Sequence, residues 1–289
     1  MKSMKKGLLF KRKGIDSITA QSIIILIMAS IVFLVVLPLL ITIISSFKSN
    51  YEILTGIWVM PSILVWKNWT VGFSNILPNM MNSIVISSVT TIFVVFLGSI
   101  SAYVFVRQKF FGKKVLFNLI IVLMIIPSVL TLTPLYVLML ALDLKNTWFA
   151  IWFPTIAGGQ ISAIFLFSTF LGQQPESLFD AAKIDGASEF DMYMRISLPL
   201  AIPVLAIQAV STFSGAYNDF LWPALIIDEQ SKQALMPILK NLTATVATVN
   251  NAQGAMYAMY LFSGIPLVFT TLFGLKYFIK GDFASGLKL

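Results

Sequence analysis

The residues that could do chemistry in this chain are few in kind. The sequence contains no His and no Cys, which removes the usual acid–base group of neutral pH, thiol nucleophiles and the common zinc ligands. It has no Gly-x-x-x-x-Gly-Lys-Ser/Thr phosphate loop. No apolar stretch carries the pair of carboxylates that an intramembrane hydrolase would use for acid–base work. We therefore predict that the chain is not an enzyme and holds no metal or cofactor of its own.

The most distinctive polar segment is residues 173–199, with the sequence QQPESLFDAAKIDGASEFDMYMRISLP. Pro175 suits the first turn of a helix, and Glu176 would lie beside the positive end of the helix dipole. The apolar residues that follow recur at helical spacing. The first half of the segment therefore predicts a short helix that ends near Ile184.

A turn and a second short helix are expected next. Asp185 and Gly186 form a turn pair, because glycine accepts left-handed backbone angles at little cost. Ser188 stands three residues before Asp191, the spacing of a helix N-cap. The segment thus reads as helix, turn, helix. Its apolar side chains are expected to be exposed and to need a partner surface: Phe179, Ile184, Phe190 and Met192.

A second polar feature is a stripe at helical spacing further along the chain. We expect the stripe to face the interior of a helix bundle, where polar groups either contact a solute during its passage or hold helices together. Asp219 is the only acidic residue that we place within an apolar span. The stripe consists of Gln208, Ser211 with Thr212, Gly215 and Asp219.

The composition places these features in a membrane protein. Of the 289 residues 58% are hydrophobic and 11% charged, and the mean hydropathy is +0.89, far from the balance of a soluble domain. One helix needs roughly 20 apolar residues to cross a bilayer. The chain is therefore expected to be one all-α integral membrane domain over residues 1–289 with six transmembrane helices. The expected spans are residues 21–46, 81–106, 115–140, 148–171, 200–226 and 255–278.

The charge distribution predicts the orientation. A net charge of +8 would suggest nucleic-acid binding in a soluble protein, but here the basic residues cluster between apolar spans, so no nucleic-acid partner is expected. The run from residue 21 is too long for a cleaved signal segment. With both termini in the cytoplasm, the inner segments hold most Lys and Arg: Lys2, Lys5, Lys6, Lys11, Arg12, Lys13, Arg107, Lys109, Lys113, Lys114, Lys183, Arg195, Lys276, Lys280 and Lys288.

Two outer segments are expected to be long, residues 47–80 and 227–254. The first carries Trp58, Trp66 and Trp69, and such aromatic residues favour the membrane–water interface. We therefore expect this segment to lie on the outer membrane surface. Prolines in most spans would bend helices, either as irregular packing or to frame a central cavity.

The stretch DAAKIDGAS at 180–188, followed by ISLPL at 196–200, resembles the signature loop of ABC-importer permeases. The family pattern is Glu-Ala-Ala, three residues, Gly, and then about nine residues to Ile-x-Leu-Pro; Asp180 stands where the family usually has Glu. The resemblance implies that this loop is the coupling helix that sits in a cleft of a cytoplasmic ATP-binding subunit. An amphipathic connector at the membrane surface is the alternative. The implied coupling residues are Asp180, Ala181, Ala182, Asp185 and Gly186.

Longer and weaker patterns are similar to sugar permeases of the maltose type. They are Asn82-Ser83, Ala102-Tyr103, Arg107, Leu144 to Thr147, and Tyr217 to Phe220, with Tyr217 where the family commonly has Trp. This likeness implies a carbohydrate cargo, for which an oligosaccharide is one candidate. Tyr217 and Trp222 could stack on sugars or belong to the interfacial belt. The expected pathway residues are Gln208, Ser211, Gly215, Tyr217, Asn218 and Asp219.

The resemblance also implies the assembly. It predicts the type I importer permease fold in a bacterial cell membrane, with a second permease subunit, two ATP-binding subunits and an extracytoplasmic solute-binding protein as partners. ATP and magnesium are expected in the ATP-binding subunits. The alternative from another class is an ion-coupled secondary transporter. Such a transporter usually needs charged residues inside the membrane for ion coupling, and this sequence offers Asp219 alone.

Overall fold

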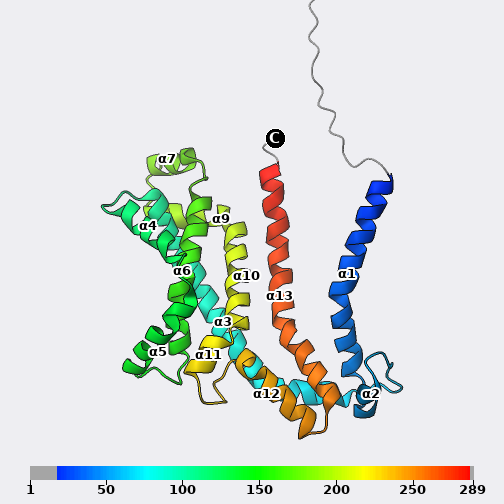
Figure 1. Cartoon of the computed structure of the whole chain (residues 1–289). Helices are drawn as coiled ribbons and strands as arrows, with labels where there is room; N and C mark the ends of the chain where they lie inside the picture. The colour runs from blue at the N-terminus through cyan, green and yellow to red at the C-terminus, as the bar shows by residue number, and fades with distance from the viewer. Residues whose placement is uncertain (1–17, 287–289) are drawn as a thin grey trace, which may run out of the picture.

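The computed structural model describes residues 18–286, and this part of the chain is helical, with no strand. Long apolar runs form helices because a helix satisfies its backbone hydrogen bonds internally. Figure 1 shows α4, α7 and α9 at one end of the molecule, and α2, α5 and α12 at the other. The elements are α1 (Ile18–Ser46), α2 (Asn50–Thr55), α3 (Lys67–Arg107), α4 (Lys113–Leu123), η1 (Ser128–Thr131), α5 (Leu132–Ala141), α6 (Phe149–Leu171), α7 (Glu176–Ile184), α8 (Glu189–Met192), the π-helical η2 (Tyr193–Ser197), α9 (Leu198–Leu200), α10 (Ile202–Asn218), α11 (Leu221–Ile226), α12 (Leu235–Thr248) and α13 (Gln253–Gly286).

Four of these helices, α1, α3, α6 and α13, are long and apolar enough to cross a membrane. Two bent pairs also pass this test, so the described residues hold up to six spans if each pair counts as one. The first pair is α4 with η1 and α5, and the second joins the α8–α9 segment to α10. The prediction of an all-α membrane protein is confirmed.

Two predicted spans are not single helices. The span expected at 115–140 bends by 97° between α4 and the η1–α5 segment, because Pro127 is extended at φ −61°, ψ 126° and has no N–H to donate. The span expected at 200–226 ends at Asn218. Asp219 takes an extended conformation, and α11 follows as a separate helix.

The two segments predicted to lie outside, residues 47–80 and 227–254, are also more helical than expected. α3 begins at Lys67 rather than near residue 81, and residues 227–254 contain α12. Trp58, in the loop that follows α2, is 74% exposed, and Trp66, directly before α3, is 62% exposed. Their placement at the membrane surface stays a prediction.

The core forms around α3, which packs against α6, α10 and α13. α3 and α6 approach closely at Gly98, where an added Cβ would lie 2.7 Å from the Cβ of Ala163. α1 packs mainly against α13 and exposes apolar side chains along its length. Figure 1 shows α1 diverging from α13 toward the end that carries α7.

The predicted basic residues gather at that same end. Arg107, Lys109, Lys113 and Lys114 lie at the junction of α3 and α4, beside α7. Lys2 to Lys13 and Lys288 lie outside the described residues, as does the side chain of Lys280.

Candidate functional site

The segment 173–199 folds as its sequence predicts. The first helix is α7, ending at Ile184, and Gly186 makes the turn with φ +82°. The turn is closed by the Ala187 N–H, which donates to the Ala182 carbonyl at 2.9 Å. The Ser188 hydroxyl caps α8 by accepting from the Asp191 N–H at 3.1 Å. Local sequence therefore determines the shape of this loop.

One charged residue anchors α7 to the helix bundle. Phe179 is 3% exposed, and the guanidinium carbon of Arg107 lies 3.8 Å from the centre of its ring. Nη2 of Arg107 also donates to the carbonyls of Leu171 at 3.1 Å and Gln174 at 3.0 Å. Arg107 thus joins the end of α3 to the end of α6 and to α7. A planar guanidinium can stack and donate at once, which an ammonium cannot do as well.

Further polar contacts fix the rest of the segment. Gln174 and Ser197 are buried and exchange two hydrogen bonds of 2.9 Å, from Nε2 to the Ser197 carbonyl and from Oγ to Oε1. The Tyr103 hydroxyl on α3 donates to Oε2 of Glu189 at 3.0 Å. The two halves of the loop are therefore attached to the bundle at separate points. The Gln174–Ser197 pair could not be predicted from local sequence, because its two residues are 23 positions apart in the chain.

The outward surface of α7 and its turn is left free for a partner. Asp180, Ala181, Asp185 and Gly186 are exposed residues, and Ala182 is half-buried. Ile184 is 87% exposed. The five predicted coupling residues therefore lie on one short helix and its turn. The exposed carboxylates of Asp180 and Asp185 and the exposed side chain of Ile184 lie on the same short segment. We call this surface, residues 180–186, the coupling surface.

Two of the four apolar residues expected on the outside are inside. Phe179 and Met192 are 3% and 2% exposed and belong to the core formed with α3, α6 and α10. Ile184 and Phe190, at 87% and 69%, remain available. The expectation was wrong for Phe179 and Met192 because the bundle itself supplies their partner surface.

The polar stripe on α10 is divided between the inside and the outside of the chain. Gln208 is 6% exposed, and its Nε2 donates to Thr212 Oγ1 at 3.1 Å and to Ser162 Oγ at 3.4 Å. Ser211 and Gly215 are exposed, as is Asn218. The inner part of the stripe therefore holds α10 to α6, and the outer part is free to meet a solute or another subunit.

The remaining members of the predicted pathway have local structural roles. Tyr217 is fully buried, and its hydroxyl donates to the Ser263 carbonyl at 3.0 Å. Asp219 lies between α10 and α11 rather than within a helix, where Oδ1 accepts from the Leu221 N–H at 3.1 Å and the Trp222 N–H at 3.4 Å. Trp222 is 5% exposed, so neither aromatic ring offers a free stacking face in this chain.

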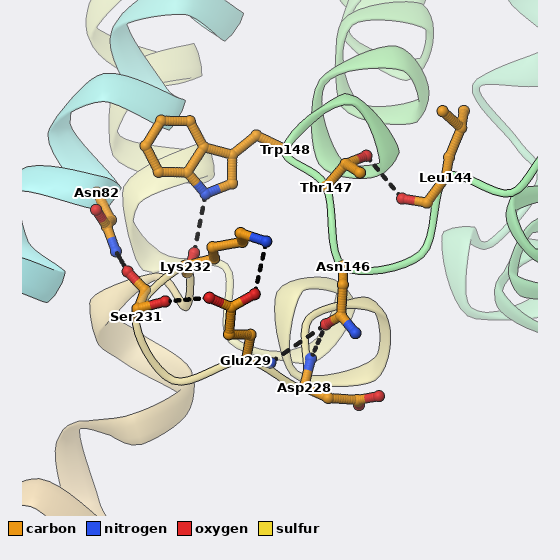
Figure 2. Close-up of polar contacts among 9 residues, drawn as sticks. All are labelled: Asn82, Leu144, Asn146, Thr147, Trp148, Asp228, Glu229, Ser231 and Lys232. Atoms are coloured by element: carbon orange, nitrogen blue, oxygen red, sulfur yellow. Dashed lines mark hydrogen bonds and ion pairs between the residues drawn. The ribbon is translucent and has the colours of Figure 1, made fainter.

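At the opposite end of the molecule, the Leu144–Thr147 pattern forms a junction with the loop after α11, shown in Figure 2. Asn146 has φ +61°, and its Oδ1 accepts from the N–H groups of Asp228 at 2.5 Å and Glu229 at 3.2 Å. Nζ of Lys145 lies 2.7 Å from Oδ2 of Asp228, and this hydrogen bond raises the pKa of the lysine. The α5–α6 connection is thereby held to the α11–α12 loop.

The same junction reaches α3 and α6. The Trp148 Nε1–H donates to the Lys232 carbonyl at 2.9 Å, and Nδ2 of Asn82 donates to the Ser231 carbonyl at 2.8 Å (Figure 2). The Ser231 hydroxyl donates to Glu229 Oε1 at 2.6 Å. These contacts hold the loop after α11 to the long helices α3 and α6.

Metal-ligating side chains do not cluster in the part of the chain that the structure describes. Within residues 18–286 no group of three or more His, Cys, Asp or Glu side chains is placed to hold a metal ion.

Comparison with known proteins agrees with this architecture. Residues 94–281 match the family described as binding-protein-dependent transport system inner membrane component. The chain is 31% identical to the arabinooligosaccharides transport system permease protein AraQ of Halalkalibacterium halodurans, over 90% of this chain and 94% of that protein. It is 28% identical to the maltodextrin transport system permease protein MalD of Streptococcus pneumoniae, over 92% and 93% of the two chains.

A solved structure shares the fold. It is a chain of a bacterial ABC transporter involved in the import of the acidic polysaccharide alginate, with a TM-score of 0.79 at 18% identity, over 91% of this chain and 98% of that one. The predicted type I importer permease fold is confirmed by this likeness. The chain belongs to the inner membrane component family of binding-protein-dependent transport systems.

Proposed function

We propose that this chain is the transmembrane permease subunit of an ATP-driven, binding-protein-dependent carbohydrate importer, and that it forms the pathway with a second permease subunit. The observation that carries the proposal is the coupling surface, exposed at residues 180–186 while Arg107 and Phe179 bind its helix to the bundle. The names of AraQ and MalD specify arabinooligosaccharides and maltodextrin. They support an oligosaccharide as the cargo.

The mechanism follows from the anchoring of α7. A force on the coupling surface would reach α3 and α6 through the hydrogen bonds of Arg107. It would reach α10 through the hydrogen-bonded pair Gln174 and Ser197, because Ser197 lies in the chain shortly before α10. Buried side chains in well-packed cores move together, since packing leaves little free volume. Closure of the ATP-binding subunits would therefore shift these helices as a group and open the pathway outward.

The partners and the orientation complete the proposal. The basic residues beside α7 support a cytoplasmic position for that end and for both termini. Two ATP-binding subunits would bind there and carry the ATP and magnesium, so this chain would not be an enzyme. An extracytoplasmic solute-binding protein would deliver the sugar to the end formed by α2, α11 and α12 in a bacterial cell membrane.

The pathway would include the exposed part of the stripe. Ser211, Gly215 and Asn218 leave polar groups and open space on one side of α10. Hydroxyl and amide groups of this kind hydrogen-bond to sugar hydroxyls without requiring a charge. Tyr217 contributes by packing, because it is buried.

The absence of native Cys allows a direct test. Ala181→Cys on the coupling surface is paired with a single Cys in the cleft of a co-expressed ATP-binding subunit, and crosslinking is measured with and without nucleotide. We expect a specific crosslink whose yield changes with nucleotide. Ala244→Cys, exposed on α12 at the other end, is the matched control and should not crosslink. An assembled complex without any Ala181→Cys crosslink would contradict the coupling role.

Energy dependence tests the rival class. Uptake by cells or vesicles that carry the full complex should stop when ATP is depleted and should be insensitive to collapse of ion gradients. Uptake that follows an ion gradient and survives ATP depletion would favour the ion-coupled transporter.

A further inference from the structure

A pocket with a basic rim lies where α3 ends, between α4 and α6. Its volume is about 420 Å³. Phe105, Val106 and Phe117 form an apolar wall, and Lys113 and Lys114 stand at the edge. It is separate from the coupling surface and from the stripe on α10. Its lining contains no acidic residue, so its charge is wholly positive.

One buried polar group in this pocket has no partner. Ser168 is 8% exposed and lines the pocket, and its Oγ makes no hydrogen bond within the described residues. An unsatisfied buried hydroxyl costs roughly 1–3 kcal/mol, so such groups are uncommon unless a ligand or water meets them. A serine hydroxyl can donate to an anionic oxygen.

The start of α4 adds positive potential at the same place. Gly112 precedes the helix and has no side chain to cap it, so the first N–H groups of this 11-residue helix lack side-chain acceptors. Nζ of Lys113 donates to the carbonyls of Val106 at 3.3 Å and Gln108 at 3.0 Å, which fixes one ammonium at the pocket edge. Lys114 is exposed.

The pocket lies at the boundary of two candidate membrane spans, α3 and the α4–α5 pair. Between them, the side chain of Phe111 is fully exposed, and Phe110 is 38% exposed. Phenylalanine at the tip of a loop between spans, flanked by lysines, is suited to dip into the bilayer while the ammonium groups stay at headgroup level. The pocket is thus reached from the lipid headgroup region.

We propose that this pocket binds the phosphate of an anionic phospholipid. Lys113, Lys114, the first N–H groups of α4 and the Ser168 hydroxyl would hold the phosphate, and one acyl chain would lie along Phe105 and Phe117. The same phosphate chemistry could be met by free inorganic phosphate, but an apolar wall next to the basic rim favours a lipid. Anionic lipids are drawn to such basic clusters on the cytoplasmic side.

Native mass spectrometry of the full transporter complex tests the site. The complex is titrated in detergent with phosphatidylglycerol, with phosphatidylcholine of the same chains, and with inorganic phosphate alone. We expect phosphatidylglycerol to be retained about tenfold more strongly than phosphatidylcholine, as one well-placed charged contact would give. K114Q/S168A should remove that preference, and K276Q/S30A, with matched changes outside the pocket, should keep it.

Each outcome decides the proposal. Equal retention of the two lipids by the parent complex would overturn it without recourse to a variant. Retention of inorganic phosphate in place of lipid would assign the site to a free anion and also overturn it. Because Ser168 Oγ has no partner among the described residues, S168A removes an unsatisfied hydroxyl and should not lower the thermal stability of the lipid-free complex. A loss of lipid by this variant therefore reports binding rather than misfolding.

Discussion

At the residue scale, Gly186 controls the shape of the coupling surface. Its φ of +82° is a conformation that costs other residues about 1–2 kcal/mol, and no neighbouring atom lies within 4 Å of a Cβ built there. Gly186→Ala should therefore act through the backbone alone. We expect about a fivefold loss of uptake per ATP hydrolysed, measured in vesicles with the assembled complex.

The matched control is Gly264→Ala on α13, which is equally open but has no positive φ. It should leave coupling unchanged. A Gly186→Ala complex with full coupling would show that the turn can change shape without consequence.

A second residue-scale feature is the carboxylate of Glu52. Its two oxygens accept from the N–H and hydroxyl of Ser62 at 2.7 and 2.6 Å, and from those of Ser49 at 2.8 and 2.9 Å. These hydrogen bonds, those from Ser62 foremost, lower the pKa of Glu52 from 4.5 to about 2. The carboxylate thus joins Ser49, before α2, to Ser62, in the loop after α2.

The lowered pKa gives this loop a pH dependence of known sign. Because the folded form favours the ionised carboxylate, its stabilisation is complete above pH 4.5 and is lost as the pH falls from 4.5 toward about 2. We expect cleavage of residues 49–62 by an acid-tolerant protease to accelerate over this range. The Glu52→Gln variant should be cleaved faster than the parent at neutral pH, and its cleavage rate should change little as the pH falls from 4.5 toward about 2.

The exposed acid Glu176 at the start of α7 provides the control. Glu176→Gln should keep the parent's pH dependence of cleavage at residues 49–62. If Glu52→Gln also kept it, another group would be responsible.

At the scale of elements, Asn146 joins the α5–α6 connection to the loop after α11 (Figure 2). Asn146→Ala would leave two N–H groups without their acceptor and place alanine at φ +61°. Together these changes should cost at least about 2 kcal/mol. We expect the Tm of the detergent-solubilised complex to fall by about 5 °C, measured by scanning fluorimetry.

Two further variants serve as a rescue and as a control for Asn146→Ala. Asn146→Asp keeps an acceptor oxygen and tolerates left-handed angles, so it should recover most of the Tm. Asn241→Ala, on the exposed side of α12, should change the Tm by no more than about 1 °C. A small effect of Asn146→Ala would mean that the two loops are held mainly by Lys145–Asp228 and Trp148.

At the scale of the whole molecule, the exposed side of α10 is expected to line the pathway. No atom lies within 4 Å of a Cβ built on Gly215, so a larger side chain fits within this chain and projects outward. Gly215→Leu should reduce sugar uptake by about tenfold or more, with normal assembly, because it fills space that the solute needs. Uptake of labelled oligosaccharide into vesicles measures this.

Gly264→Leu is the control, since this position on α13 is equally open but lies outside the predicted stripe. It should transport normally. Normal uptake by Gly215→Leu would place that side of α10 against lipid and would move the pathway to another helix face.

Much of the architecture was predictable from local sequence. Long apolar runs located α1, α6 and the start of α13 closely, because a bilayer requires helices of a set length. The α7 turn at Gly186 and the Ser188 cap were also predictable, since their hydrogen bonds join residues five positions apart or fewer. The alternation of helix and turn in the loop therefore followed from a few adjacent residues.

Other features depended on distant contacts. The burial of Phe179 beneath Arg107, the Gln174–Ser197 pair and the burial of Tyr217 against Ser263 join residues far apart in the chain. Likewise the division of the α10 stripe depended on which neighbours α10 meets. The sequence by itself determined the all-helical membrane architecture, the positions of α1 and α6, and the local form of the coupling surface. It did not predict the break at Pro127, the end of α10 at Asn218 or the early start of α3. Only the tertiary structure decided which side chains face inward, because burial is a property of the neighbours that packing supplies.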